Sequence, residues 1–292
     1  MRQSLAVKIP FFCFVMVLQV FCLPLKAEEG GQTPLPQKGA LSQRIVSLSP
    51  VLTEELFLLG VGDSVVGRTR YCTKPAETDK IEVVGNLTEI NVEKIVSLRP
   101  DLVLVIPLTD PRAKQKLRSL GIRVEEFPEA ADFRGICDSF LRLAGMVHKE
   151  KAAADLIEKA KREVSRIRQE TGSRQPPAVF IEVGADPLVT MVKGSYFHDL
   201  IEFSGGVNIA AEAVHQLYSR EKVLAKDPDI IIIVSMGFDG EEEKRIWQGY
   251  PGLKAVRQGK IILVDSDLFC APTPVSFVHA LQGVEKILHA EN

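Results

Sequence analysis

Two stretches of this chain, at 91–106 and 219–234, have nearly the same sequence, and this repetition is the strongest constraint on its fold. The first reads NVEKIVSLRPDLVLVI and the second reads SREKVLAKDPDIIIIV. In each copy, a short segment with helical spacing ends before Pro-Asp and leads into a continuous aliphatic run. Such runs are typical of strands buried on both faces, as in a parallel sheet covered by helices. The chain is therefore predicted to contain two α/β lobes of similar construction.

The rest of the chain supports this organisation. Strand-like runs and helical segments alternate up to residue 130, and Thr53 and Gly60 are the predicted cap and the predicted end of one early helix. Residues 133–171 have helical spacing, and their second half is rich in Ala, Glu, Lys and Arg, which predicts one long exposed helix. The alternation restarts after Pro177. The predicted fold is α/β, with two doubly wound lobes joined by one long α-helix.

The first residues have the character of a secretory signal. Arg2 and Lys8 precede a long apolar run, and the small residue Ala27 stands just before an acidic stretch. An uncleaved anchor is the alternative, because a run of this length is near the lower limit for crossing a bilayer. We expect a periplasmic protein. The predicted segments are a signal peptide at 1–27, a flexible leader at 28–40, an N-terminal lobe at 41–147, a linker helix at 148–172 and a C-terminal lobe at 173–292.

Charge and cysteine content exclude several classes of protein. Lys and Arg number 36 against 38 Asp and Glu, so the net charge does not favour binding to nucleic acid or an anionic membrane. Past the signal segment only Cys72, Cys137 and Cys270 remain, without a CxxC pair or the spacing of zinc ligands. We therefore expect neither a disulfide framework nor a resident metal site, and Cys137 is expected on the apolar face of a helix, as a small residue of the protein core.

No enzyme signature is present in the sequence. It contains no GxxxxGK[ST] loop, no GxGxxG after a strand, no HExxH and no GxSxG. The competing hypothesis is an exported metal- or tetrapyrrole-handling enzyme with a cleft between its lobes, for which His198, His279 and Cys270 are the candidate groups. A scaffold or adhesion protein has little support, because no longer repeat is found.

Two of the cysteines lie in loops that are candidates for a ligand site. Cys72 in RTRYCTKP and Cys270 in DSDLFCAPTP each follow a predicted strand. Ligands of doubly wound sheets bind at loops beyond the carboxyl ends of strands, so both loops are candidates for a ligand site. The two thiols are interpreted either as unrelated loop residues or as groups that contact a ligand, contact a soft metal or bridge the lobes.

Three segments carry a resemblance to a known family. They are RIVSLSPVLTEELFLLGVGDSVVGRTRYCTKP, IEVVGNLTEINVEKIVSLRPDLVLV and SREKVLAKDPDIIIIVS. Together they resemble the periplasmic solute-binding proteins of ABC importers for cobalamin, ferric siderophores and haem, and the match extends from Leu41 to the C-terminus. The resemblance implies two α/β lobes joined by one rigid helix, with the ligand in the cleft between them.

The resemblance also gives the repeat a role. In the family, each lobe presents a glutamate that contacts arginines of the permease, and the matching positions are Glu93 and Glu221. A simpler interpretation is helix chemistry, since glutamate in a first turn favours the helix dipole and Pro-Asp is common after a helix. The recurrence of the whole pattern favours a shared role. A permease dimer offers two equivalent patches, and each lobe would supply one complement.

The sequence indicates the ligand less clearly than it indicates the family. Leu87 stands where the cobalamin binder has an aromatic residue. The loop SDLFCAPTP lacks the arginine that the cobalamin binder has there, although Asp267 and Phe269 match that protein in residue type. Arg68, Arg70 and Tyr71 are the nearest candidates for an anionic siderophore or haem. A corrinoid and an iron chelate both remain open.

These observations predict a binding protein rather than an enzyme. We expect an extracytoplasmic, monomeric component of an ABC importer that captures a bulky metal chelate, such as cobalamin or an iron chelate, and delivers it to a permease dimer with ATPase subunits. No cofactor is expected. A ligand needs a concave, mostly apolar site with a few polar groups. The predicted ligand-binding residues are Ser49, Pro50, Tyr71, Cys72, Leu87, Pro107, Met191, Tyr196, Asp267, Phe269 and Cys270.

Overall fold

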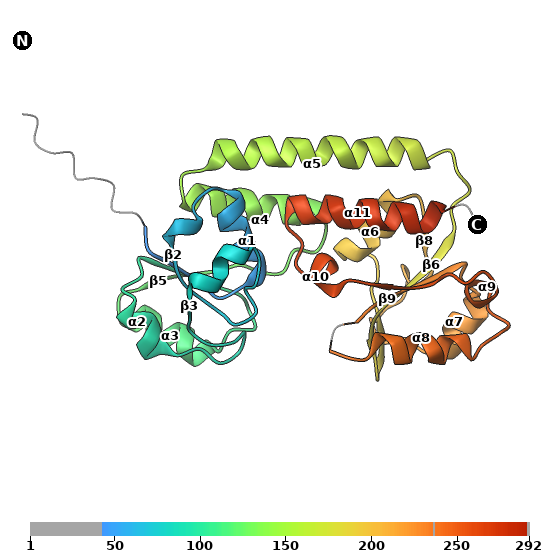
Figure 1. The fold of residues 1–292 in the computed structure, drawn as a ribbon, viewed down its shortest axis with the longest axis horizontal. Helices are drawn as coiled ribbons and strands as arrows, with labels where there is room; N and C mark the ends of the chain where they lie inside the picture. Colours follow the sequence, from blue (N-terminus) through green and yellow to red (C-terminus); the bar gives the residue numbers. More distant parts are fainter. Residues whose placement is uncertain (1–42, 236, 291–292) are drawn as a thin grey trace, which may run out of the picture. The chain divides into compact units, whose positions relative to one another are not determined.

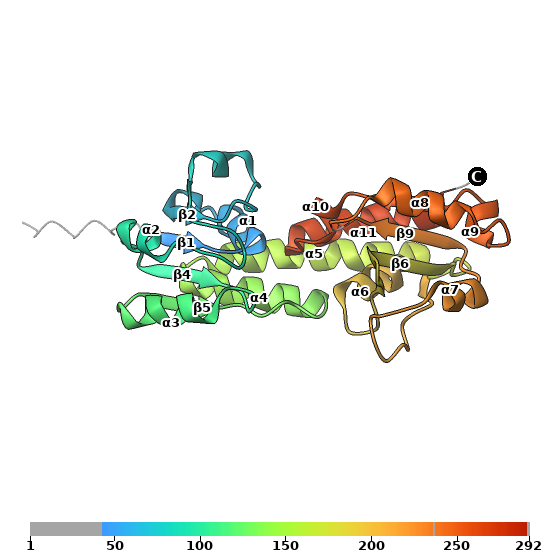
Figure 2. The same cartoon turned by 90° about the horizontal axis from the view of Figure 1, so that it is seen from below.

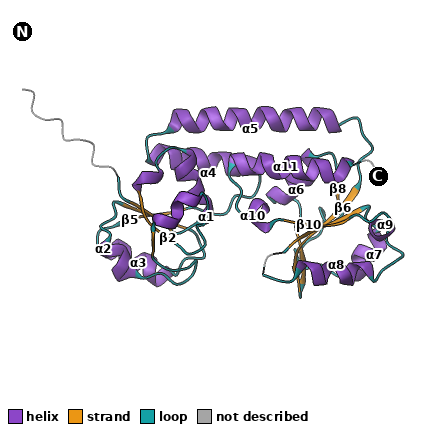
Figure 3. Cartoon of the chain, viewed as in Figure 1, coloured by secondary structure: helices purple, strands orange, loops and turns teal. Residues whose placement is uncertain are grey.

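The computed structural model describes residues 43–235 and 237–290, so the predicted signal peptide and leader lie outside the described residues. In this part of the chain, two five-stranded sheets follow one another along the sequence (Figure 1). Helices cover both faces of each sheet, as Figure 3 shows. This is the predicted α/β fold with two doubly wound lobes.

The first sheet is parallel throughout and has the strand order β3-β2-β1-β4-β5. Its strands are β1 (Ile45–Ser47), β2 (Val65–Arg68), β3 (Glu82–Val83), β4 (Leu102–Val105) and β5 (Arg123–Glu126), and its helices are α1 (Pro50–Leu58), α2 (Val92–Ser97), α3 (Pro111–Ser119) and α4 (Phe133–Met146), with short 3-10 turns at Gly62–Ser64 and Ala76–Lys80. Alternate residues of β4 enter different cores. Leu102 and Leu104 pack with α1 and α4, whereas Val103 and Val105 pack with α2 and α3.

The second sheet has the order β10-β9-β6-β7, with β8 also paired to β6. Its strands are β6 (Ala178–Ala185), β7 (Leu188–Thr190), β8 (Val207–Asn208), β9 (Ile230–Val234) and β10 (Ile261–Val264), and its helices are α6 (Tyr196–Phe203), α7 (Arg220–Lys226), α8 (Gly240–Gln248), α9 (Lys254–Arg257), α10 (Ser266–Phe269) and α11 (Pro274–His289). Only β7 is antiparallel to β6 among the described pairs. The run IIIIV of β9 is wholly buried, and its residues alternate between two cores on the two faces of the sheet.

A single helix, α5 (Glu150–Thr171), runs between the two lobes along α4 and α11 (Figures 1 and 2). The long helix is confirmed, but it is not exposed all round. Ala153, Ile157, Ala160, Val164 and Ile167 recur every three or four positions and are buried in one core that also contains α1, α4, α6 and α11. The lobes are therefore joined by a shared hydrophobic core as well as by the covalent helix.

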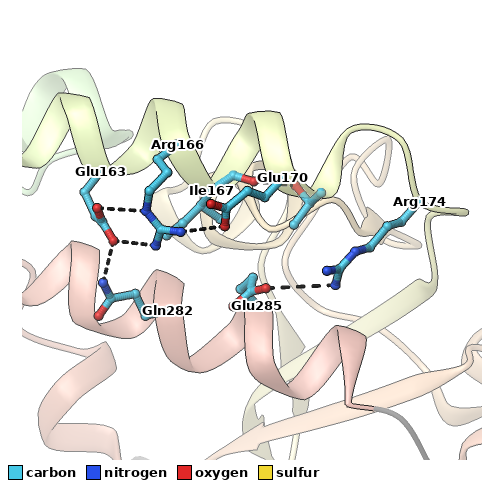
Figure 4. Close-up of polar contacts among 8 residues, drawn as sticks. Glu163, Arg166, Ile167, Glu170, Arg174, Gln282 and Glu285 are labelled. Atoms are coloured by element: carbon cyan, nitrogen blue, oxygen red, sulfur yellow. Dashed lines mark hydrogen bonds and ion pairs between the residues drawn. The ribbon is translucent and has the colours of Figure 1, made fainter.

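Polar contacts support the seam between α5 and α11 (Figure 4). Arg166 donates to Glu163 through Nε at 3.1 Å and through Nη2 at 2.6 Å, and Gln282 Nε2 of α11 donates to Glu163 Oε1 at 2.8 Å. These donors hold the pKa of Glu163 at about 2, because each favours the carboxylate. Since the residues stand at the protein surface, the contacts align the two helices more than they stabilise them.

The structure corrects one of two predictions for the first helix and confirms the other. Thr53 is not the cap of α1: the helix begins at Pro50 with Ser49 as its N-cap residue. Proline fits the first helical position because the amide hydrogen that it lacks would have no intrahelical partner there. Thr53 instead lies inside the helix, where its Oγ1 donates to Ser49 O at 2.9 Å. Gly60 is confirmed as the end, since it has a φ of 71° just after the C-cap Leu59.

A buried glutamate in α1 gives the first testable prediction. Glu55 is 1% exposed, and its Oε2 has no hydrogen-bond partner among the described residues. Burial, followed by the nearby Glu54, raises the pKa of Glu55 well above its usual value. The folded protein therefore binds this proton more tightly than the unfolded chain, and the free energy of unfolding falls as the pH rises above about 4.5.

Replacing this side chain by leucine should remove that decline. We expect Glu55→Leu to raise the free energy of unfolding by about 1–3 kcal/mol at pH 8 and by less at pH 5, because it removes a buried polar group. Urea unfolding at both pH values measures the difference. Glu158→Leu, on the exposed side of α5, is the control and should change little. Equal effects of Glu55→Leu at the two pH values would contradict the prediction.

Candidate functional site

Loops after three neighbouring parallel strands of the first lobe meet at one edge of its sheet. The strands β2, β1 and β4 are adjacent and parallel, so their carboxyl ends lie together. Ser49 and Pro50 follow β1, Tyr71 follows β2, and Pro107 follows β4. Ser49 is buried, whereas Pro107 and the ring of Tyr71 are exposed. This edge therefore carries most of the ligand-binding residues predicted for the first lobe.

Two residues predicted in the first lobe have other surroundings. Cys72 is fully buried, and its Sγ lies 3.2 Å from Thr69 Oγ1, so it offers no surface to a ligand in this structure. Leu87 is half-buried in a turn after β3, where Asn86 Oδ1 accepts from the backbone amides of Thr88 and Glu89. The role predicted for Leu87 in ligand binding stays a prediction.

The predicted residues of the second lobe lie on three separate segments. Met191 follows β7, and its carbonyl accepts from Asn208 Nδ2 at 2.8 Å. Tyr196 begins α6 and stacks on Phe197 with ring centroids 4.4 Å apart, and burial raises the pKa of its hydroxyl. Phe269 is 3% exposed and belongs to the core, so it also offers no surface, while the neighbouring Cys270 is half-buried and Asp267 lies in α10.

Three exposed apolar side chains near these loops were not predicted from the sequence. Leu108 follows Pro107 and is 57% exposed, and Val214 and Leu217 in the loop after β8 are 86% and 60% exposed. That loop is tied to β7, because Thr190 N donates to Gln216 O and Tyr218 N donates to Leu188 O, each at 2.9 Å. Exposed apolar groups on anchored loops are typical of sites for large, partly apolar ligands. The sequence signal that could have identified these three side chains is the presence of apolar residues in otherwise polar loops.

The glutamates of the repeat occupy equivalent positions in the two lobes. Glu93 is the second residue of α2, whose N-cap Asn91 Oδ1 accepts from Lys94 N at 2.8 Å. Glu221 is the second residue of α7, whose N-cap Ser219 Oγ accepts from Lys222 N at 3.4 Å. Both glutamates are exposed. Hydrogen bonds from its own backbone amide and from Ser219 lower the pKa of Glu221, which keeps it charged.

A hollow lies beside each of these helices. The first has a volume of about 420 Å³ and is lined by Arg70, Gly85, Asn86, Glu89, Ile90, Asn91 and Glu93. The second has a volume of about 430 Å³ and is lined by Ala185, Asp186, Arg220, Phe238, Asp239, Glu242, Glu243 and Ile246. Each hollow is formed by residues of one lobe. The first includes the repeat glutamate itself, and the second includes the residue before it.

The groups required by the enzymatic alternative are dispersed. His198 Nε2 pairs with Glu202 Oε2 at 3.2 Å within α6, and His279 is exposed on α11. Across residues 43–235 and 237–290, no cluster of three or more His, Cys, Asp or Glu side chains could hold a metal ion. In the same part of the chain, every helix is too short or too polar to span a membrane.

Comparison with known proteins adds a family match and several relatives. Residues 45–268 match the family model described as periplasmic binding protein. The vitamin B12-binding protein of Vibrio cholerae is 28% identical over 249 residues, which cover 84% of this chain and 88% of that protein. An uncharacterized ABC transporter substrate-binding lipoprotein of Bacillus subtilis, YvrC, is 30% identical over 255 residues, or 84% of this chain and 78% of the relative.

Solved structures agree with these relatives. The crystal structure of the periplasmic vitamin B12 binding protein BtuF of Vibrio cholerae superposes with a TM-score of 0.69 at 28% identity, covering 84% of this chain and 96% of that one. The periplasmic heme-binding protein RhuT from Roseiflexus sp. RS-1 superposes with a TM-score of 0.74 at 24% identity, covering 85% and 98%. The second likeness concerns the fold alone.

Proposed function

This chain belongs to the periplasmic binding protein family and is a substrate-binding component of an ABC importer, and we propose that it captures a corrinoid. Its partners are the permease and ATPase subunits of that importer. We further propose that the protein is exported to the periplasm, acts as a monomer, docks on a permease dimer through Glu93 and Glu221, and performs no chemistry on its ligand.

The exposed apolar side chains at the strand ends are the observation that supports a corrinoid. Tyr71 and Leu108 in the first lobe, and Val214 and Leu217 in the second, offer apolar contacts to a bulky ligand. The relatives named for vitamin B12 extend over most of the chain. Apolar contacts of this kind suit a corrinoid better than an anionic chelate, which requires cationic partners.

The arginines available for an anionic chelate are limited. Arg68 is 7% exposed, its Nε donates to Thr78 O at 2.7 Å, and its Nη1 donates to Thr69 O at 3.2 Å. This guanidinium is therefore occupied inside the first lobe. Arg70 lines the hollow beside Glu93. A ferric siderophore or haem is the second candidate class of ligand, and it would depend on Arg70.

A panel of ligands tests the proposal. The purified protein should melt at a higher temperature with cobalamin, because a ligand at a hundredfold excess over its Kd stabilises the folded state by about 2.7 kcal/mol. Haem and a ferric siderophore serve as alternatives in the same assay. Leu108→Ala should weaken cobalamin binding several-fold, whereas Leu120→Ala, an exposed apolar residue at the end of α3, is the matched control. A shift with haem or the siderophore alone would overturn the corrinoid assignment.

A further inference from the structure

The two copies of the repeat differ in charge at the residue that follows the N-cap of the helix. The residue after the N-cap is Val92 in α2 and Arg220 in α7. Val92 packs on the apolar cluster of the first lobe. Arg220, by contrast, extends from the start of α7 to a group of acidic residues under the helix. Helix α7 also buries an apolar residue, Val223, and differs from α2 in the charged contact that Arg220 makes at its start.

The anchor of α7 is a buried cluster assembled from three elements. Arg220 Nη2 lies 2.6 Å from Glu243 Oε1 of α8, and the guanidinium carbon lies 4.8 Å from the centre of the Trp247 ring. Trp247 Nε1 donates to Glu182 Oε2 of β6 at 2.6 Å. Glu182 and Trp247 are fully buried, and Glu243 is 3% exposed. One cation therefore faces two buried carboxyl groups.

One proton on the two carboxyl groups balances the charges of the cluster. Glu182 and Glu243 are both buried beside one guanidinium, and burial, together with the neighbouring Glu243, raises the pKa of Glu182, which favours a proton on the pair. With one proton the pair carries a single negative charge, which Arg220 neutralises. Without it, an unpaired charge would be buried, which is strongly unfavourable. The neighbouring strand residues Thr190 and Ile233 bring no charge.

The remaining charged groups around the cluster favour the same state. The hollow beside Arg220 and Glu243 is also lined by Asp186 at the β6–β7 turn, Asp239 at the N-cap of α8, and Glu242 in its first turn. These carboxylates make the surroundings of Arg220 negatively charged. They also oppose the loss of the shared proton, since it would add another negative charge. The hollow gives solvent access to the edge of the pair.

We propose that Arg220 is the positioning residue of docking helix α7, and that one proton shared by Glu182 and Glu243 keeps this anchor intact. The proposal rests on the docking role of Glu221. When the proton leaves, two carboxylates compete for one guanidinium beside the indole, and the start of α7 loosens. The first lobe lacks an equivalent charge at Val92, so proton-dependent positioning is confined to the second lobe.

The pH range follows from the burial of the pair. Burial, and to a smaller extent Glu243, raises the pKa of Glu182 from 4.5 to about 8, although Trp247 and Arg220 act in the opposite direction. The folded state therefore holds a proton that the unfolded chain has lost. This contribution to stability is complete below pH 4.5 and is lost as the pH rises through about 8.

The tryptophan of the cluster makes the test direct, because the full sequence contains one tryptophan, Trp247. Its emission in the isolated protein should titrate with a midpoint near pH 8, since the charge beside the indole changes there. Glu182→Gln keeps an acceptor for the indole but cannot ionise, so its emission should stay constant from pH 6.5 to 9.5. Over the same range, the melting temperature of the wild type should fall by at least about 4 °C relative to the variant.

Hydrogen exchange at α7 tests positioning separately from ionisation. After correction for intrinsic rates, amides of residues 220–226 in the wild type should exchange several-fold faster above pH 8.5 than at pH 6.5, whereas those of Glu182→Gln should not. Glu82→Gln, which removes the ion pair of Lys94 in the first lobe, is the matched control and should titrate like the wild type.

Two outcomes would overturn the proposal. Emission that does not titrate in the wild type refutes the shared proton, and a titration without faster exchange in α7 refutes the positioning role of Arg220. Both measurements use the isolated protein without ligand or permease. Their failure would therefore leave the importer function untouched, whereas loss of that function would appear in ligand binding and uptake.

Discussion

Replacing Glu93 and Glu221 together by arginine is expected to abolish uptake of the ligand through the importer. Both side chains are exposed at the second position of equivalent helices, so their substitution leaves the cores intact. Truncation of one desolvated partner of an interfacial charge pair costs about 2–5 kcal/mol, and reversal adds repulsion. Ligand affinity of the isolated protein should stay within about threefold, since substitutions at remote surfaces change free energies by about 0.5 kcal/mol.

The measurement compares uptake by cells with ligand binding by purified protein. A matched control carries Asp155→Arg and Glu158→Arg, which make the same change of charge on the exposed side of α5. The control should transport normally. Wild-type uptake by the Glu93→Arg, Glu221→Arg protein would refute the docking role. Loss of ligand binding in either single variant would instead place that glutamate in the ligand site.

The second large effect is expected from Phe277→Ala in α11. Phe277 is 1% exposed and stacks on Phe133 of α4 with ring centroids 4.6 Å apart. Its edge also meets Phe203 of α6 at 6.2 Å, and Phe133 N donates to Asp199 Oδ2 at 2.8 Å. This aromatic cluster lies where the two lobes share a core. We expect a loss of about 3–5 kcal/mol in the free energy of unfolding, as for other buried Phe→Ala changes.

A control variant within one lobe distinguishes damage to the contact between the lobes from a simple loss of core volume. Phe180→Ala removes a fully buried ring from the core between β6 and α8, which contains no residue of the first lobe. Both variants should lower the urea midpoint. Only Phe277→Ala should broaden spin-label distances between the lobes. Equal broadening in both variants would show that the aromatic cluster has no special role at the joint.

Much of the fold could be predicted from periodicity, and the errors have physical causes. The β9 run IIIIV is a continuous aliphatic segment, and α5 has a regular apolar stripe, so both were recognisable. The cap of α1 was misassigned because Thr53 and Ser49 are both good capping residues, and the proline after Ser49 decided between them. Helix α8 was missed because GEEEKRIWQ contains few apolar residues.

The candidate site was harder to predict than the fold. Parallel strands bring their carboxyl ends together, so the sequence indicated which loops to consider. It did not indicate which way a loop side chain points, and Cys72 and Phe269 turn inward. The cluster around Arg220 was also invisible, because Glu182, Glu243 and Trp247 meet only through the packing of β6 and α8. These residues are too far apart in the sequence for a hydrophobic periodicity or a sequence motif to relate them.

The late position of α11 has a consequence for how the chain folds. Gln282 of α11 contacts Glu163 of α5 across 119 positions of sequence, and α11 supplies Phe277, Leu281, Val284 and Leu288 to the core that α1, α4 and α5 share. A chain that emerges from its N-terminus therefore exposes the apolar sides of the earlier helices until residues 274–289 have followed. The contact between the two lobes is therefore completed last, and the apolar sides of the earlier helices stay accessible to chaperones until then.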